Sequence, residues 1–284
     1  MAVLAIDIGG TKTAAGIVDA GRVMEHRAWA TPSSGGAREI LDAVVEQCRP
    51  WATDVDVCGV SFGGPFDFAT QSCIRSMHVS GWDDLPLSDE VSSALGVPVI
   101  ADNDANVAAL GEYAVRAPAD SDPMLYLTVS TGVGAALVVN GRVLRGAHSL
   151  AGEIGHLPIG HDRPCNCGHT GCLERAVSGY WIEHDHGLPA VDYLADDARM
   201  TEWSGDLARG LWSATLLLDP AVIVIGGGMA AQGARLESHL AAHLDAWARS
   251  SMRSAPTVVL GDASGRTVLL GAAVLAEEHA HGSR

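Results

Sequence analysis

The chain has 284 residues, of which 48% are hydrophobic and 18% are charged, a balance typical of a globular protein with a substantial core. Acidic residues outnumber basic residues 34 to 18, so the formal net charge is −16. This charge argues against a nucleic-acid binder or a protein of anionic membrane surfaces, because such surfaces need clustered Lys and Arg. We find no long apolar run and no basic leader before Val3, so we expect no membrane span, no signal peptide and a cytoplasmic location.

The N-terminal half alternates patterns of strands and helices. Strands are predicted over Val3–Asp7, Thr13–Val18, Arg22–Thr31, Val55–Ser61 and Val97–Ala101. Helices are predicted over Ala37–Cys48, from a cap at Ser88 to a stop at Gly96, and over Asp104–Val115. This order indicates an α/β fold with a mostly parallel sheet and an antiparallel hairpin at one side.

A second unit begins near Met124, and its first hairpin resembles the first hairpin of the chain. Residues 11–23 (TKTAAGIVDAGRV) and 131–143 (TGVGAALVVNGRV) match without gaps at six of thirteen positions. Chance similarity between two hairpins rich in Ala, Gly and Val is one interpretation, and duplication of a lobe is the other. Strands over Ala221–Ile225 and Thr257–Leu260, with helices over Ala234–Ala248 and Thr267–Glu278, favour duplication. We therefore predict two similar lobes around a cleft, covering residues 1–118 and 119–284.

Glycine-rich turns follow three of these strands. Asp7 precedes Gly9-Gly10-Thr11-Lys12, and Ser130-Thr131-Gly132-Val133-Gly134 occupies the corresponding place in the second unit. Adjacent glycines let backbone N–H groups approach phosphate oxygens, and a neighbouring carboxylate can hold a hydrated Mg²⁺. Taken alone each segment is a turn, but together they indicate two loops that grip one polyphosphate. Gly226-Gly227-Gly228 offers a further surface free of side chains, suited to a purine ring.

Asp104 follows a predicted strand in the segment Ala101-Asp102-Asn103-Asp104-Ala105-Asn106. A carboxylate at a helix N-terminus stays ionised and can accept a proton from an attacking hydroxyl, while Asn103 binds a neighbouring substrate oxygen. Plain capping of the helix is the alternative, because Asn and Asp are preferred at that position. The chain has neither a P-loop nor a dinucleotide-binding fingerprint.

Three of the six cysteines, Cys165, Cys167 and Cys172, lie within eight residues and follow the segment Glu153-Ile154-Gly155-His156. Three thiolates and one imidazole make a closed tetrahedral zinc site of the structural kind. His156 is the expected fourth ligand, and His161 and His169 are the alternatives. A loop anchored in this way would position Glu153 and Glu174. Cys48, Cys58 and Cys73 stand apart, and we expect them to be buried thiols.

In this order, the segments DIGGTKT, ADNDANVAALGE, STGVGA, AGEIGH, CNCGHTGCLE and VIVIGGG resemble the ROK family of bacterial sugar kinases and related repressors over nearly the whole chain. The combination of EIGH with CxCGxxGCxE is highly specific. The resemblance implies an actin-like ATPase (ribonuclease H-like) fold, with a nucleotide between two lobes, a hexose deeper in the cleft and a zinc-binding loop.

The resemblance also implies roles for individual residues. Asp104 matches the family's catalytic base, and Gly64 lies at its sugar-facing turn. Residues matching those that bind the sugar hydroxyls are Asn103, Glu153, His156 and Glu174. Residues matching the zinc ligands are His156, Cys165, Cys167 and Cys172. Residues matching the ATP and Mg²⁺ site are Asp7, Gly9, Gly10, Thr11, Lys12, Thr131, Gly132, Gly134, Gly227 and Gly228.

The expected function is ATP-dependent transfer of the γ-phosphoryl group to the 6-hydroxyl of a hexose such as glucose, or of an N-acylhexosamine. The alternative is a non-catalytic sugar sensor that acts through a partner protein, which Asp104 disfavours because a sensor needs no base. No helix-turn-helix segment precedes Val3, so we expect no direct DNA binding. The stretch between Gly179 and Asp219 is shorter than in most family members, and whether the chain forms a homodimer stays open.

Overall fold

The chain folds into two compact units in the computed structural model, which describes residues 1–74, 79–116, 120–251, 253–262 and 265–282. The first unit comprises the chain up to Arg116 together with helix α9 (Arg266–Gly282), and the second comprises the segment between them. The expected boundary at residues 118 and 119 lies outside the described residues. The assignment of the last residues to the second lobe is corrected, because α9 packs on the sheet of the first unit.

The first unit is an α/β unit built on a five-stranded sheet, as far as the chain is described. Its sheet has the order β3-β2-β1-β4-β7, formed by β1 (Val3–Ile8), β2 (Lys12–Asp19), β3 (Arg22–Ala30), β4 (Val57–Phe62) and β7 (Val99–Asn103). Strands β1, β4 and β7 are parallel, and β2 and β3 add an antiparallel hairpin, as predicted. The remaining elements are α1 (Gly36–Cys48), a 3₁₀ helix (Arg49–Asp54), β5 (Phe66–Asp67), β6 (Ser72–Cys73), α2 (Leu87–Leu95) and α3 (Asp104–Val115).

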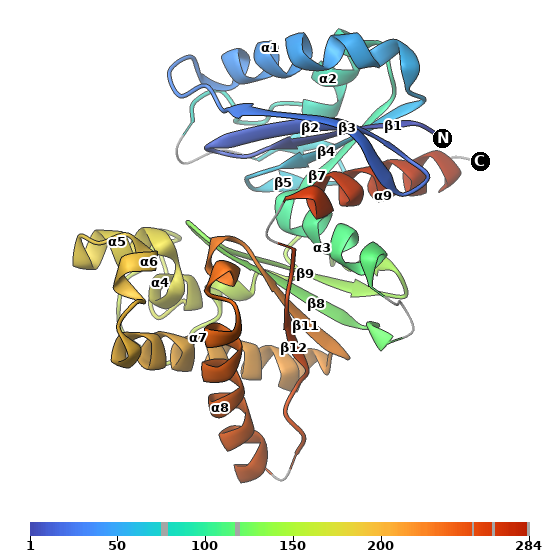
Figure 1. Ribbon diagram of the computed structural model, residues 1–284. Coiled ribbons are helices and arrows are strands. Elements are labelled where there is room, and N and C mark those ends of the chain that lie inside the picture. Colours follow the sequence, from blue (N-terminus) through green and yellow to red (C-terminus); the bar gives the residue numbers. More distant parts are fainter. Residues whose placement is uncertain (75–78, 117–119, 252, 263–264, 283–284) are drawn as a thin grey trace. The chain divides into compact units, whose positions relative to one another are not determined.

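Helices α1 and α2 cover one face of this sheet, and α3 and α9 lie on the other (Figure 1). Glycines let α9 approach its neighbours closely. A Cβ atom on Gly111 of α3 would overlap the carbonyl oxygen of Thr267, and one on Gly271 would overlap the carbonyl oxygen of Val107. The two helices therefore cross with their backbones in contact, which a side chain at either glycine would prevent.

Two local predictions in this unit have different outcomes. Helix α2 ends at Gly96 in the left-handed conformation, with a φ of 74°, as predicted. Ser88 does not cap the helix, which begins at Leu87; its hydroxyl instead donates a hydrogen bond to Gln71 Oε1 at 2.7 Å. The Ser88 hydroxyl is therefore bound to Gln71, 17 residues earlier in the chain, and not to the backbone at the start of the helix.

The scattered cysteines are buried thiols, as predicted. Cys48, Cys58 and Cys73 are free and fully inaccessible. Burial raises the pKa of Cys48 to about 12, with only partial compensation from the charge of Arg27. These thiols therefore pack as small apolar side chains.

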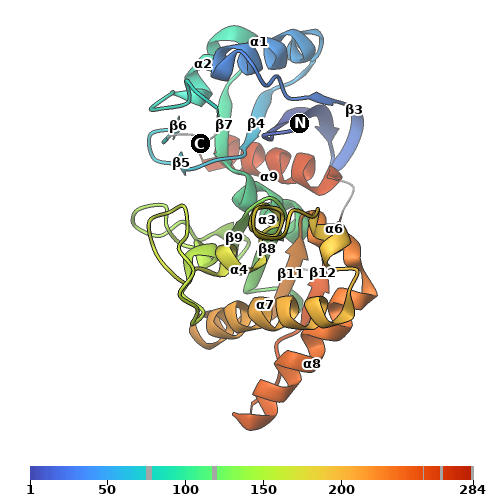
Figure 2. The same ribbon diagram turned by 90° about the vertical axis from the view of Figure 1, so that its left-hand side faces the viewer.

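The second unit repeats the strand order of the first. Within the described residues its sheet has the order β10-β9-β8-β11-β12, formed by β8 (Met124–Val129), β9 (Val133–Val139), β10 (Arg142–Val143), β11 (Val222–Gly226) and β12 (Val258–Leu260). Its helices are α4 (Leu173–Val177), α5 (Gly179–His186), α6 (Ala190–Tyr193), α7 (Asp197–Leu218) and α8 (Ala234–Ser250), with 3₁₀ turns over Ile154–His156 and Gly228–Gln232. Helices α7 and α8 lie side by side and pack on the sheet through Leu207 and Leu240 (Figure 2).

The two N-terminal hairpins have the same turn. Ala20 and Gly21 have φ values of 48° and 71°, and Asn140 and Gly141 have φ values of 53° and 74°. Positive φ at both central residues is the two-residue turn that matches the twist of paired strands. Together with the shared strand order, this confirms that the sequence similarity reflects a repeated structural unit. In the described part of the chain, every helix is too short or too polar to span a bilayer.

Candidate active site and metal centre

The carboxyl ends of β1, β4 and β7 place candidate site residues of the first unit at one sheet edge. Asp7 pairs with Ser61, and Ser61 pairs with Asp102, across the parallel strands. Turns beginning at Gly9 and Gly63 follow β1 and β4, and helix α3 begins directly after β7 at Asp104. In open α/β sheets this edge is where ligands bind.

Asp7 is a half-buried carboxylate at this edge, where Asp102 is almost fully buried. The Ser61 hydroxyl donates a hydrogen bond to Asp7 Oδ1 at 2.7 Å. Burial raises the pKa of Asp7, and the Ser61 hydrogen bond and the charge of Lys12 offset this only in part. Sequence reasoning missed Ser61, although its place at the end of a strand parallel to β1 was the signal that could have found it.

The first glycine loop is a tight turn with an open side. Gly9 donates a backbone hydrogen bond to the Lys12 carbonyl at 3.2 Å, and the Thr31 hydroxyl donates to the Gly9 carbonyl at 2.7 Å. A Cβ atom on Gly10 would meet no atom within 4 Å, and Thr11 and Lys12 are exposed. The loop therefore leaves exposed backbone and side-chain donors of the kind that bind phosphate groups.

Asn103 and Asp104 form the junction between β7 and α3. Asn103 Oδ1 accepts a hydrogen bond from the Ala105 amide at 3.0 Å and thereby caps α3, while Asn103 Nδ2 donates to the Gly64 carbonyl at 3.0 Å. Both polar atoms of Asn103 thus join the Gly64 turn to the helix. Asp104 lies in the first helical turn, and a Cβ atom on Gly63 would lie 3.8 Å from Asp104 Oδ2. The structure therefore brings Gly64, Asn103 and Asp104 together.

The second unit has a corresponding loop between β8 and β9. Thr131 and Gly132 lie in this loop and Gly134 lies near the start of β9, as Gly10 and Thr11 lie between β1 and β2. Glu174 Oε2 accepts a hydrogen bond from the Val133 amide at 2.9 Å, and a Cβ atom on Gly132 would lie 2.9 Å from the same oxygen. Glu174, for which the family resemblance implies a sugar contact, thus supports this loop directly.

Gly227 and Gly228 follow β11 and differ in their surroundings. Gly227 has a φ of 80°, and a Cβ atom there would lie 2.5 Å from the Val129 carbonyl oxygen. Gly228 is exposed, with Ser130 Oγ 3.5 Å from the position of a Cβ atom. The backbone conformation therefore requires glycine at position 227, whereas Gly228 contributes an exposed surface without a side chain.

Four residues of the second unit form a candidate metal centre. His156, Cys165, Cys167 and Cys172 each offer one ligand atom, and these atoms all lie within 4.8 Å of one another. Gly168 and Gly171, with φ values of 90° and 83°, make the turns that return Cys172 to the cluster.

The chemistry of this donor set fits zinc. His156 Nδ1 is buried and has no hydrogen-bond partner among the described residues, a costly arrangement that a metal ion relieves. Burial and the neighbouring sulfur atoms of Cys167 and Cys165 raise the pKa of Cys172 to about 12. A divalent cation would stabilise the adjacent thiolates, and three sulfurs with one imidazole make a closed structural zinc site.

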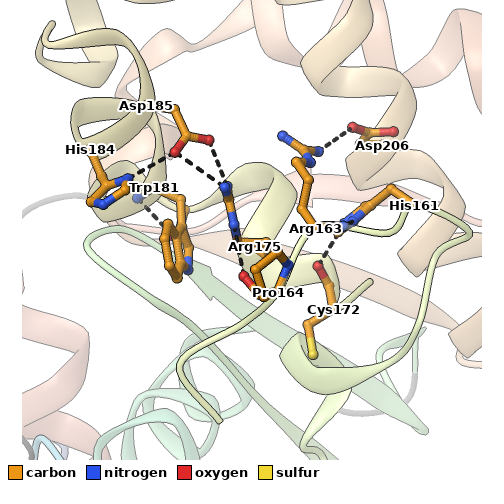
Figure 3. A network of polar contacts seen from close by, with 10 residues as sticks. His161, Arg163, Pro164, Cys172, Arg175, Trp181, His184, Asp185 and Asp206 are labelled. Carbon is orange, nitrogen blue, oxygen red and sulfur yellow. Dashed lines mark hydrogen bonds and ion pairs between the residues drawn. The ribbon is translucent and has the colours of Figure 1, made fainter. Parts of the chain in front are cut away.

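The two alternative histidines are placed elsewhere. His161 Nδ1 accepts a hydrogen bond from the Arg163 amide at 3.2 Å, and its Nε2 lies 3.1 Å from the Cys172 carbonyl (Figure 3). Both ring nitrogens of His161 are therefore engaged. His169 is exposed and lies outside the cluster of ligand atoms. The geometry therefore favours His156 as the fourth ligand.

Glu153 lies beside the other nitrogen of His156. Its Oε2 is 4.0 Å from His156 Nε2, so the ring can face the metal with one nitrogen and a carboxylate with the other. Burial raises the pKa of Glu153, the neighbouring His156 acts to lower it and the Glu174 carboxylate acts to raise it further. Glu153 and Glu174 are thus close enough to interact electrostatically.

Comparisons with known proteins agree on one family. A family model described as the ROK family matches residues 3–279. A glucokinase of Halalkalibacterium halodurans is 32% identical over 283 residues, a match covering 86% of this chain and 85% of that protein. An N-acetylmannosamine kinase of Vibrio vulnificus is 39% identical over 181 residues, covering 63% of this chain and 62% of that protein.

A solved structure extends the likeness to three dimensions. The ROK family glucokinase from Streptomyces griseus, in complex with glucose and AMPPNP, matches with a TM-score of 0.81 and 28% identity, covering 98% of this chain and all of that one. The two five-stranded sheets of the described residues, with their repeated strand order, are those of an actin-like α/β fold. The chain belongs to the ROK family.

Proposed function

We propose that this protein is an ATP-dependent sugar kinase that phosphorylates the 6-hydroxyl of a hexose or an N-acylhexosamine. The observation that carries the proposal is the edge of the first sheet, where Asp104 stands beside the Gly63 turn and Asp7 stands beside an open phosphate-type loop. Membership of the ROK family supports it, because the similar proteins named above are a glucokinase and an N-acetylmannosamine kinase.

Asp104 is the general base of the proposed reaction. Its carboxylate accepts the proton of the sugar hydroxyl while that oxygen bonds to the γ-phosphorus and the bond to ADP breaks. Asn103 ties the Gly64 turn to the start of α3, and so holds Asp104 at a defined distance from this turn. Glu153 and His156 present polar atoms suited to the remaining sugar hydroxyls.

The glycine loops bind the nucleotide in this proposal. Residues 9–12 and 131–134 donate hydrogen bonds to phosphate oxygens, and Gly228 offers a flat surface to the base. Asp7 would hold the hydrated Mg²⁺ of the nucleotide, which would supply positive charge near the transferring group. Zinc at His156 and the three cysteines has a structural role.

The substrate class follows from the relatives. One similar protein is a glucokinase, one is an N-acetylmannosamine kinase, and the structure with a TM-score of 0.81 contains glucose and AMPPNP. The two sugars share a pyranose ring with a free 6-hydroxyl and differ at carbon 2. Hexoses and N-acylhexosamines are therefore the compounds to compare.

A coupled assay of ADP release tests the proposal. The purified protein is incubated with ATP, Mg²⁺ and, one at a time, glucose, mannose, fructose, N-acetylglucosamine and N-acetylmannosamine. We expect sugar-dependent ADP release with at least one of them. Sugar binding by calorimetry without ADP release from any of them would contradict the kinase and support the sugar sensor.

A further inference from the structure

The loop between β8 and β9 is held by the α4–α5 segment (Leu173–His186), through Glu174 of α4 and the first two residues of α5. The Val133 amide donates to Glu174 Oε2 at 2.9 Å. The Gly179 amide donates to the Ser130 carbonyl at 2.7 Å, and the Tyr180 amide donates to the Thr131 carbonyl at 3.1 Å. The position of this candidate phosphate loop therefore depends on where α4 and α5 are fixed.

Arg175, next to Glu174 on α4, binds both the cysteine loop and α5 (Figure 3). Its Nε donates to the Pro164 carbonyl at 3.0 Å, one residue before the metal-cluster residue Cys165. Its two terminal nitrogens donate to the two oxygens of Asp185 on α5, at 2.7 and 3.1 Å. One guanidinium thus connects α4, α5 and the cysteine loop.

The ion pair between Arg175 and Asp185 is largely shielded from water and stacks on an aromatic ring. The side chains of Arg175 and Asp185 are 9% and 23% exposed, and the guanidinium carbon lies 4.0 Å from the centroid of the Trp181 ring. Burial acts to raise the pKa of Asp185, but hydrogen bonds from Arg175 and His184 outweigh it and hold the pKa below its ordinary value. Bidentate pairs shielded from water define geometry more strictly than exposed ones.

We propose that Arg175 is a positioning residue for nucleotide binding. With Asp185, it fastens the α4–α5 segment to the cysteine loop, and that segment in turn holds the backbone of residues 130–133. The inference rests on the proposed nucleotide-binding function. It assigns to this pair an effect on phosphate-loop geometry without contact with the nucleotide.

Three variants test the proposal: Arg175→Met removes the guanidinium, Arg175→Lys keeps its charge without the planar fork, and Asp185→Asn weakens the pair from the other side. We expect AMPPNP to bind Arg175→Met about tenfold more weakly, the scale seen when supporting partners of a site are removed. Arg175→Lys should be intermediate, because an ammonium cannot make both contacts at once. Hydrogen exchange at the amides of Val133, Gly179 and Tyr180 should become faster, while β8 amides keep their protection.

Arg199→Met is the matched control. Arg199 also stacks on an aromatic ring, that of Tyr193 at 4.8 Å, and lines the same crevice as Arg175. We expect wild-type AMPPNP affinity in this variant. Should Arg175→Met fail to fold, Asp185→Asn, which alters the less buried partner, provides the measurement.

The outcomes separate this inference from the proposed function. Wild-type protein that does not bind AMPPNP contradicts the function itself. If wild type binds AMPPNP and both Arg175→Met and Asp185→Asn bind it equally well, the positioning role is overturned. It is also overturned if weaker binding accompanies zinc loss by elemental analysis and is restored by added zinc.

Discussion

Asp104 is placed where a small chemical change should have a large kinetic effect. It stands at the start of α3 beside Gly63, while Asn103 takes the capping role. Asp104→Asn preserves size but removes the base, so we expect kcat to fall by about a hundredfold or more. Sugar affinity by calorimetry and the melting temperature should stay close to wild type. The same change at the exposed Asp89 on α2 is the control, and near-normal turnover of Asp104→Asn would refute the assignment.

We expect Asp7 to lower the stability of the folded protein at neutral pH while it contributes to Mg²⁺-nucleotide binding. Burial raises its pKa above the ordinary value of 3.8, so the folded state holds the proton more tightly than the unfolded chain. Stability must then fall as pH rises through the interval between the two values. Asp7→Asn should therefore unfold at a higher urea concentration than wild type at pH 7, and this gain should shrink as pH is lowered toward 3.8. The variant should also lose affinity for Mg²⁺-AMPPNP, and a gain independent of pH would argue against this explanation.

Side-chain partners were the part of the site that sequence reasoning could not supply. Local spacing was enough to select Asp7, Asp104 and the cysteine loop, because each lies at a strand end or a tight turn. Ser61 and Glu174 make contacts across 54 and 41 residues of sequence. Such contacts depend on sheet register and on helix placement, which no local pattern encodes.

At the scale of elements, the cysteine loop is the unit whose structure depends on a metal ion. Cys167→Ser and His156→Ala each remove one of four ligands that lie within 4.8 Å of one another. We expect about one zinc per chain in wild type and weaker zinc retention in both variants, measured by elemental analysis after competition with a chelator. The melting temperature should fall in parallel, because the loop loses its cross-link.

His169→Ala is the control for this measurement, since His169 lies in the same loop but outside the cluster. It should retain zinc as wild type does. Zinc retention by His156→Ala together with zinc loss from His169→Ala would reverse the choice of the fourth ligand. Protein that contains no zinc as purified would exclude the metal centre.

Elements of the sheets were predictable because their signals are local or repeated. Short apolar runs that end at glycine-rich turns mark the central strands, and the similarity of residues 11–23 to residues 131–143 indicates the second hairpin. Helix α9 was predicted as a helix but placed in the wrong unit. Its apolar pattern does not say which sheet it covers, whereas the structure shows close backbone contact with α3 at Gly111 and Gly271.

At the scale of the whole molecule, the chain leaves the first unit and returns to it only with α9. Leu269 and Leu275 of this helix are 2% exposed, and α9 packs on α3, β1 and β4. Burial of two leucines contributes roughly 3–6 kcal/mol, a large share of the ~5–15 kcal/mol that holds a typical domain folded. The first unit therefore depends for its stability on the last helix of the sequence.

Hydrogen exchange can test this dependence unit by unit. In Leu269→Ala, we expect a loss of about 2–5 kcal/mol, confined to the first unit and seen as reduced protection of the β1 and β4 amides. Leu207→Ala, a matched change in the buried face of α7, should reduce protection of β8 and β11 instead. A variant ending at Asp262, which lacks α9 altogether, should expose β1 and β4 even further while β8 and β11 keep wild-type protection. Equal loss in both sheets after the Leu269 change would show that the two units unfold as one, and would contradict the assignment of α9 to the first.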